Sequence, residues 1–296
     1  VKINNIKPNV NYEGSFSLRG ANFVGIGVKN NLAKITIIKN GKPFVTSRSA
    51  EVIISDAKIF CSASRNNITL NTGDSIIHPS ANFTYLLKDQ TLEFARYSSG
   101  LGQAPFSDSY HKLDYYVPKI IINVKENMLM LTYEKGTSQE QKMARFESNH
   151  YYDIELYNKL QGLSAVHPLV AIDKYTYKYD KYVLSEGECA TALGGSLEQV
   201  RPLMLQLAVL GFISYDTENK RVTINRKLEH FVKGHAGKTD YDNIAIICDF
   251  RPKELKGYSD EEIKKNESLK ALVAQYKEQN ERRRMYENYG TFNMST

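Results

Sequence analysis

The chain has 296 residues, of which 42% are hydrophobic and 24% charged, so it is long enough for two folded domains and a tail. Its three cysteines are far apart and form no Cys-x-x-Cys pair, so neither a disulfide scaffold nor a cysteine zinc site is indicated. No run of 18 apolar residues occurs, and this excludes a membrane-spanning helix within the chain. The net charge of +6 arises in residues 1–150, which hold 18 Lys and Arg against 12 Asp and Glu.

Residues 1–150 are predicted to form an antiparallel β-rich domain, either a sandwich or jelly-roll-like, with a β-solenoid as the alternative. Short runs rich in Ile, Val, Thr, Phe and Tyr recur between turn residues, and Asn40-Gly41 is a strong hairpin signal. Examples of the predicted strands are 14–19, 21–28, 33–39, 51–56, 57–62, 67–70, 81–87, 91–97, 119–124 and 127–133.

Two histidines in this region each have an Asp and a Ser within five positions, namely His78 and His111. Such local spacing is weak support for a hydrolase, because the members of a catalytic triad meet through folding and no Gly-x-Ser-x-Gly elbow is present. We expect each histidine to bond a backbone carbonyl. A hydrolase centred on His111 remains the third functional alternative, and we expect no cofactor or bound metal.

Tyrosines are concentrated where the β-rich region meets the next one. Among them are Tyr115, Tyr116, Tyr151 and Tyr152. A tyrosine ring suits an interface because it has an apolar face and a polar end. We therefore expect these four residues at an interface, chiefly the one between the two domains.

Residues 151–232 are predicted to form a winged-helix-like domain, from the order helix, strand, helix, helix and hairpin. The first helix covers 153–162, and the apolar segment 167–172 follows it in the place of the strand. Ser185 and Ser196 are expected to cap the two later helices, which end at Gly194 and Gly211. The hairpin follows over 212–224. Leu203, Leu207 and Leu210 are expected to form the core face of the last helix.

This domain could read DNA, but its charge argues against that use. Residues 151–230 hold 9 Lys and Arg against 10 Asp and Glu, and phosphate contacts supply most of the affinity for DNA. Arg201 is the one basic residue early in the last helix, beside Glu198, and Lys220 and Arg221 on the hairpin are the best counter-argument. A DNA-binding regulator is therefore the second functional alternative.

Residues 233–258 are predicted to be a linker with one strand-like segment at 243–250, and residues 259–296 a partly exposed helix and tail. Ser259 to Glu262 fits a capping box. The helix then carries one apolar stripe followed by a polar, basic end that has no core to face. We expect a protein partner along this helix, at Leu269, Leu272, Val273, Tyr276, Arg282, Arg283 and Arg284.

The stretches GQAPFSDSYHKLDYY (102–116), FESNHYYDIELYNKLQGLSAVHPLVAI (146–172) and RPLMLQLAVLGFISYDTENKRVTI (201–224) resemble segments of very large, uncharacterised cell-envelope proteins of Bacteroidetes-type bacteria. That resemblance carries no catalytic motif. It implies a piece of a longer envelope-associated chain, and a first residue other than methionine favours the same interpretation. We therefore expect a non-enzymatic structural or protein-binding module of a cell-envelope assembly. Its expected partners are other protein subunits, in the periplasm or at the cell surface, and not nucleic acid.

Overall fold

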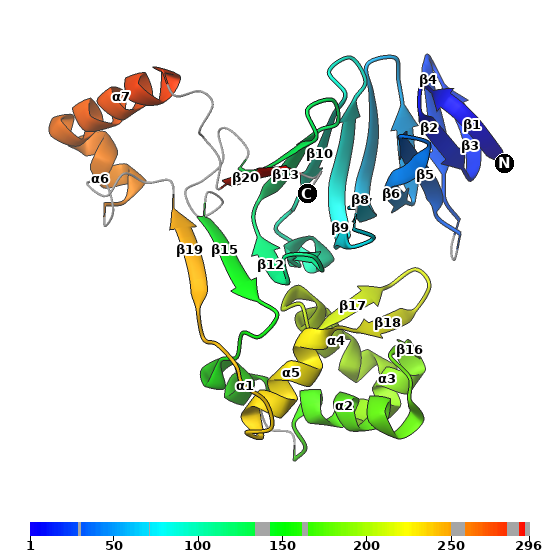
Figure 1. The fold of residues 1–296 in the computed structure, drawn as a ribbon, viewed down its shortest axis with the longest axis vertical. Coiled ribbons are helices and arrows are strands. Elements are labelled where there is room, and N and C mark those ends of the chain that lie inside the picture. Colours follow the sequence, from blue (N-terminus) through cyan, green and yellow to red (C-terminus); the bar gives the residue numbers. More distant parts are fainter. Residues whose placement is uncertain are drawn as a thin grey trace.

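The computed structural model describes residues 1–28, 31–70, 72–133, 143–161, 165–249, 258–282 and 290–293. A large antiparallel sheet is followed by helices with a small three-stranded sheet, and then by a C-terminal helix (Figure 1). This arrangement confirms the predicted α+β class.

Seventeen strands of the described residues form the large sheet. They are β1 (Lys2–Lys7), β2 (Val10–Glu13), β3 (Ser15–Arg19), β4 (Asn22–Ile26), β5 (Ala33–Lys39), β6 (Lys42–Ser49), β7 (Glu51–Ile54), β8 (Lys58–Thr69), β9 (Ser75–Leu86), β10 (Thr91–Ala95), β11 (Phe106–Asp108), β12 (Leu113–Tyr116), β13 (Lys119–Asn123), β14 (Met128–Thr132), β15 (Met143–Ser148), β19 (Ala245–Asp249) and β20 (Gly290–Asn293). The strand β19 lies within the segment 243–250 that the sequence predicts to be strand-like. The strands β1, β2, β6, β11, β12 and β15 lie in the predicted β-rich region outside the ranges named above, and β20 lies in the predicted helix and tail.

The hairpin between β5 and β6 turns at Asn40 and Gly41, as predicted. Both residues have a positive φ, of 51° and 73°. Such a two-residue turn matches the right-handed twist of the paired strands, and asparagine and glycine adopt that backbone conformation at low cost.

The long strands β8 and β9 each take part in two halves of the sheet. The first part of β8 pairs with β7 and its last part pairs with β6, while β9 pairs with β10 near its end and with β11 near its start. The register of β8 shifts between Cys61 and Asn66, and Ala63 there has a φ of 46°. This irregularity explains why the sequence predicted two strands, at 57–62 and 67–70, where the structure has one.

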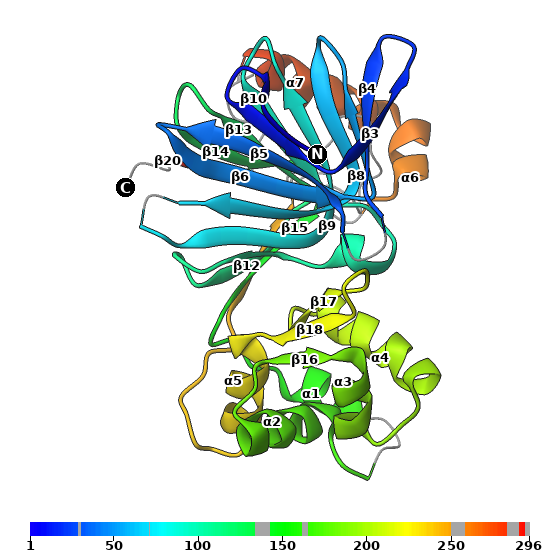
Figure 2. The same ribbon diagram turned by 90° about the vertical axis from the view of Figure 1, so that its right-hand side faces the viewer.

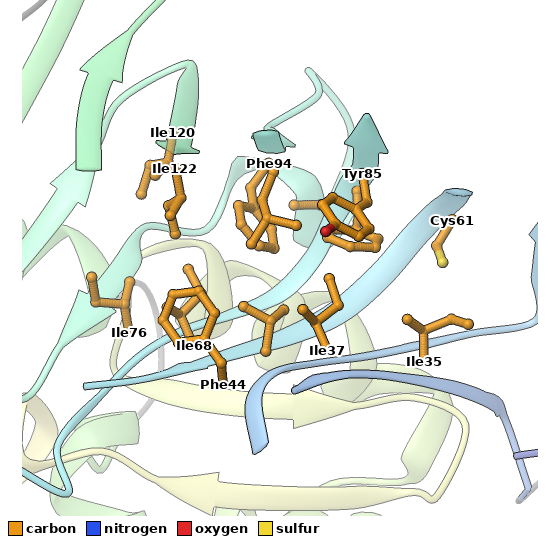
Figure 3. Packing of buried hydrophobic residues seen from close by; sticks show 14 of the residues in the cluster. Ile35, Ile37, Phe44, Cys61, Ile68, Ile76, Tyr85, Phe94, Ile120 and Ile122 are labelled. Carbon is orange, nitrogen blue, oxygen red and sulfur yellow. The ribbon is translucent and has the colours of Figure 1, made fainter. Parts of the chain in front are cut away.

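The buried side chains of the two halves face each other and form the first core (Figure 3). One row comes from β5, β6, the last part of β8 and the start of β9, and the opposite row comes from the first part of β8, the end of β9, β10 and β13. The residues labelled in Figure 3 are Ile35, Ile37, Phe44, Cys61, Ile68, Ile76, Tyr85, Phe94, Ile120 and Ile122. Strand alternation places every second residue in this core, which leaves the outer face polar.

The helical region begins after β15. Its elements are α1 (Ile154–Gln161), α2 (Pro168–Tyr179), β16 (Val183–Ser185), α3 (Glu186–Leu193), α4 (Leu197–Val209), β17 (Ile213–Asp216), β18 (Arg221–Ile224) and α5 (Arg226–His235). The strands pair in the order β16-β18-β17. In both ribbon views the β17–β18 hairpin lies between the large sheet and the helices α2 and α3 (Figures 1 and 2).

The predicted helix ends are present. Ser185 accepts a hydrogen bond from the Glu188 backbone N–H, and the Glu188 carboxylate accepts one from the Ser185 backbone N–H, which completes a capping box. Gly194 ends α3 with a φ of 72°, and Gly211 follows α4 with a φ of 79°. Both positions favour glycine because other residues are strained at such angles.

Two expectations for the helical region need correction. The apolar segment at 167–172 begins the helix α2, with His167 as its N-cap, and the strand of the predicted order is β16. The buried face of α4 contains Val200, Met204, Leu207 and Ala208, whereas Leu203 and Leu210 are half-buried. A helix turns by about 100° per residue, so both leucines flank the buried stripe, and α4 ends before Leu210.

The C-terminal helices are α6 (Asp260–Lys265) and α7 (Glu267–Arg282), and Ser259 and Glu262 form the predicted capping box. Among the residues whose side chains the structure describes, none of α6 or α7 belongs to either core cluster. Leu269, Leu272 and Val273 are half-buried, Tyr276 and Arg282 fall within α7, and Arg283 and Arg284 lie outside the described residues. Beyond α7, β20 pairs with β14, so the tail returns to the large sheet.

Candidate functional site

A buried group of charges joins the large sheet to the helical region. We call Asp114, Tyr116, Glu147 and Lys227 the junction network. The Lys227 Nζ atom lies 2.6 Å from Glu147 Oε2 and 3.5 Å from Asp114 Oδ2, and these three side chains are at most 7% exposed. Asp114 on β12 and Glu147 on β15 are direct neighbours in the strand register. Two like charges in that position repel each other, so the ammonium group between them is what makes the pairing stable.

The turn between α4 and β17 closes the network from the helical side. The Tyr116 hydroxyl donates to the Leu210 carbonyl over 3.2 Å, and the Lys227 Nζ atom is 3.4 Å from the same hydroxyl. A Cβ atom at Gly211 would lie 2.9 Å from Asp114 Oδ2, so this close approach requires glycine.

Burial and the neighbouring charges set the protonation states of the side chains in the junction network. Burial by itself would lower the pKa of Lys227, but Tyr116, Asp114 and Glu147 together raise it above its usual value. Burial raises the pKa of Asp114 and the pKa of Tyr116. Lys227 is therefore a firmly held cation at neutral pH, and an ammonium group has no lone pair with which to attack a substrate.

Arg145 on β15 extends the network towards the helical region and balances its charge. Its Nε atom lies 2.7 Å from Glu147 Oε1, and its Nη2 atom donates to the Tyr151 hydroxyl over 3.0 Å. Two cations thus face two carboxylates. The arrangement fits an anchor that holds the helical region against the sheet.

The second group of titratable side chains surrounds Asp108, which is fully buried. Its carboxylate accepts hydrogen bonds from the Tyr110 and His111 backbone N–H groups at 2.9 and 3.1 Å, and from the Tyr115 hydroxyl at 2.6 Å. His111 Nδ1 lies 2.7 Å from the same carboxylate, so this ring nitrogen contacts a side chain. The Ser109 hydroxyl donates to Asp74, so the local Asp-Ser-His spacing does not assemble a serine–histidine relay.

His78 lies where the sequence predicts a structural histidine. Its Nε2 atom is 2.8 Å from the Ala104 carbonyl oxygen, and its Nδ1 atom accepts from the Ser80 backbone N–H over 3.1 Å. Burial lowers the pKa of His78 to about 3, so it is neutral at physiological pH.

The four tyrosines of the expected interface lie at different places. Tyr116 and Tyr151 contact both regions, through the junction network and through Arg145. Tyr115 belongs to the first core and Tyr152 to the second, where the Tyr152 hydroxyl is 2.8 Å from His235 Nδ1.

Strand β19 carries an exposed apolar surface that the sequence did not mark as a site. Ile244, Ile246 and Ile247 are 67%, 59% and 57% exposed. One edge of β19 pairs with β15, and no pairing of its other edge occurs among the described residues. Neighbouring residues of a strand point to opposite faces, so both faces of β19 are apolar and exposed. An unbroken apolar run such as 244–248 is typical of a strand covered on both sides. This run was the feature of the sequence from which an apolar surface on β19 could have been predicted.

In the described part of the chain, no group of three or more His, Cys, Asp or Glu side chains is placed to hold a metal ion. Nor does any helix there have the length and apolar character needed to cross a membrane. Comparison with protein-family models found no match, and comparison with curated proteins found none.

Proposed function

We propose that this chain is a non-enzymatic structural and protein-binding part of a bacterial cell-envelope assembly, and that it binds an extended segment of another protein along the outer edge of β19. The observation that carries this proposal is the exposure of Ile246 and Ile247 on opposite faces of an edge strand. Edge strands usually carry charged residues that prevent pairing with other chains. In β19 the one charged residue is Asp249 at the end of the strand, so the two exposed isoleucines have no charged neighbour beside them in the strand.

An added strand would pair with the edge of β19 that has no partner strand among the described residues, and its alternate side chains would contact the two isoleucines. This mode of recognition takes its affinity from main-chain hydrogen bonds and its specificity from alternate side chains. The partner segment should therefore be extended and rich in β-branched apolar residues. The half-buried stripe of α7, at Leu269, Leu272 and Val273, provides a second surface for the same assembly.

The finer architecture that we propose is a β-sandwich at 1–150, a winged-helix-like domain at 151–232, a linker at 233–258 and a helical tail at 259–296. Support for the sandwich comes from the two facing rows of the first core. Support for the winged helix comes from the succession α3, α4 and the β17–β18 hairpin, with β16 completing a three-stranded sheet. The two core clusters share no residue.

We favour protein binding over DNA binding because α4 lacks a free basic surface. Arg201 Nη2 lies 3.1 Å from Glu186 Oε2, so the basic residue early in this helix is already paired. In addition, Leu101, from the 3₁₀ helix at Gly100–Gln103, packs against the core of the helical region, so the β-rich region covers part of that region's surface.

Duplex DNA should bind weakly even at low salt. Tight binding that falls steeply with salt, and that Lys220→Gln with Arg221→Gln abolishes, would favour the DNA-binding alternative.

Site-specific photo-crosslinking in a cell that makes the protein tests the β19 surface. A photoreactive phenylalanine analogue is placed at Ile246 or Ile247, and at Leu18 as a control that is 73% exposed on β3. We expect a discrete protein adduct from positions 246 and 247, whose crosslinked peptide is an extended apolar segment, and no such adduct from position 18. The absence of an adduct at 246 and 247, or the same adduct at all three positions, would contradict the proposal.

A further inference from the structure

Three basic side chains form a row across the outer face of the large sheet. Lys34 on β5, Arg48 on β6 and Arg65 on β8 are direct neighbours in the strand register, and Glu13 on β2 precedes Lys34 in the same row. Residues directly opposite each other in antiparallel strands point to the same face. We call Lys34, Arg48 and Arg65 the basic row.

The two ends of the basic row have carboxylate partners. Lys34 Nζ lies 2.8 Å from Glu13 Oε2, and Arg65 Nη1 lies 2.7 Å from Asp216 Oδ2 on the hairpin of the helical region. Among the residues that the structure describes, no carboxylate lies within ion-pair distance of Arg48, which is exposed between the two other cations. Like charges opposite each other on neighbouring strands are unfavourable, so this place in the row favours an anion.

Arg48 and Arg65 also line two hollows between the sheet and the β17–β18 hairpin. Their volumes are about 370 and 110 Å³, and both hollows are lined by Arg48, Arg65, Pro79 and Tyr215. The larger lies within the range of small-molecule sites.

The other walls of the larger hollow show how an organic ligand could lie. Ser80 and Tyr97 line it, and their hydroxyl oxygens are 2.5 Å apart. Asp216, which pairs with Arg65, and Glu218 line it from the hairpin. The negative group of a ligand is therefore favoured beside Arg48 and Arg65. Its uncharged part is favoured beside the ring of Tyr97.

We propose that Arg48 and Arg65 bind the carboxylate or phosphate group of a small organic anion, seated between the large sheet and the β17–β18 hairpin. A guanidinium group offers parallel N–H donors that match the oxygens of either group, and such charge-assisted pairs are stronger than neutral hydrogen bonds. Arg65 holds Asp216 as well, so the bound anion would contact a residue that links the two regions.

Calorimetric titration of the full chain with phenyl phosphate, benzoate and inorganic phosphate, at constant ionic strength, tests this site. We expect at least one organic anion to bind, and Arg48→Gln to weaken its binding by about tenfold or more, as the loss of a charge-assisted pair does. Arg48→Lys keeps the charge but loses the paired donors, so its affinity should lie between those of the unchanged protein and Arg48→Gln. Comparison of phenyl phosphate with benzoate decides which anionic group is preferred.

Lys42→Gln is the matched control, because Lys42 is an exposed cation on the same strand that does not line either hollow. It should leave the affinity unchanged. No binding of any probe at about 10 mM, which corresponds to less than about 3 kcal/mol, would overturn the proposal. Equal binding by Arg48→Gln and the unchanged protein, or equal losses in Arg48→Gln and Lys42→Gln, would do so too. Thermal melting shows whether each variant is folded.

Discussion

The junction network and the basic row are both clusters of charged residues on strands of the large sheet. They differ in how deeply the charges are buried and in whether the cations have carboxylate partners. In the junction network, Asp114 and Glu147 are buried and face Lys227 and Arg145. In the basic row, Arg48 is exposed and lacks a carboxylate partner among the described residues. A buried charge is costly unless it is paired, whereas an exposed charge is screened by water and can remain unbalanced.

This difference affects how shifted pKa values are interpreted. A strongly perturbed titratable group in a cleft is often a functional residue, but structural ion-pair networks also perturb pKa values. Here the shifted pKa values of Lys227, Asp114 and Tyr116 belong to a closed, balanced network of buried charges. Binding is better placed at the open hollow beside Arg48, where an exposed positive charge remains unbalanced.

The largest expected effect is that of Lys227→Met. It leaves Asp114 and Glu147 buried without their shared cation, and breaking a buried pair in this way costs about 3–5 kcal/mol. Urea denaturation measures the free energy of unfolding. Lys233→Met is the control, because Lys233 and Glu229 are 50% and 39% exposed, and such surface pairs contribute less than about 1 kcal/mol. Equal losses in the two variants would mean that the network is not the anchor between the regions.

Leu207→Ala gives an apolar reference within the helical region. Leu207 is fully buried in the second core, and truncations of buried leucines cost about 2–5 kcal/mol. Leu203→Ala, at a half-buried position of the same helix, should cost clearly less. If chemical denaturation gives the larger loss for Leu203→Ala, the buried face of α4 is assigned wrongly.

The contribution of Lys227 should depend on pH at the alkaline end. Its pKa in the folded protein is raised above the usual 10.5, so its stabilising contribution is complete below that value and is lost as the pH rises through the folded pKa. The stability difference between the unchanged protein and Lys227→Met should therefore stay constant from neutral pH to about 10, and narrow above it. A difference that narrows between pH 6 and 8 would contradict the raised pKa.

The smallest effect is expected for Arg48→Gln without added anion. Removing this exposed cation relieves its repulsion with Lys34 and Arg65, so the free energy of unfolding should change by less than about 0.5 kcal/mol, or rise slightly. A loss above about 2 kcal/mol, the size seen when buried polar groups are disrupted, would show that Arg48 has a structural role instead.

Local features of the fold were predictable because they depend on neighbouring residues. Asn40-Gly41 favours a tight hairpin wherever two strands flank it, and Ser185 and Glu188 complete a capping box three residues apart. Gly194 and Gly211 end helices because their backbone angles suit glycine. The sequence also determined the α+β class, since strand and helix periodicities occupy separate parts of the chain.

Only the tertiary structure decided which distant residues meet. The junction network joins residues from β12, β15 and α5, and the basic row depends on the registers of β5, β6 and β8. A shift of one residue in either register would turn these side chains to the opposite face. Periodicity does not specify such a register, because it depends on the packing of the whole sheet. The composition of β19 suits a buried strand. The strand is exposed because no layer covers it among the described residues, and this depends on the packing of distant segments.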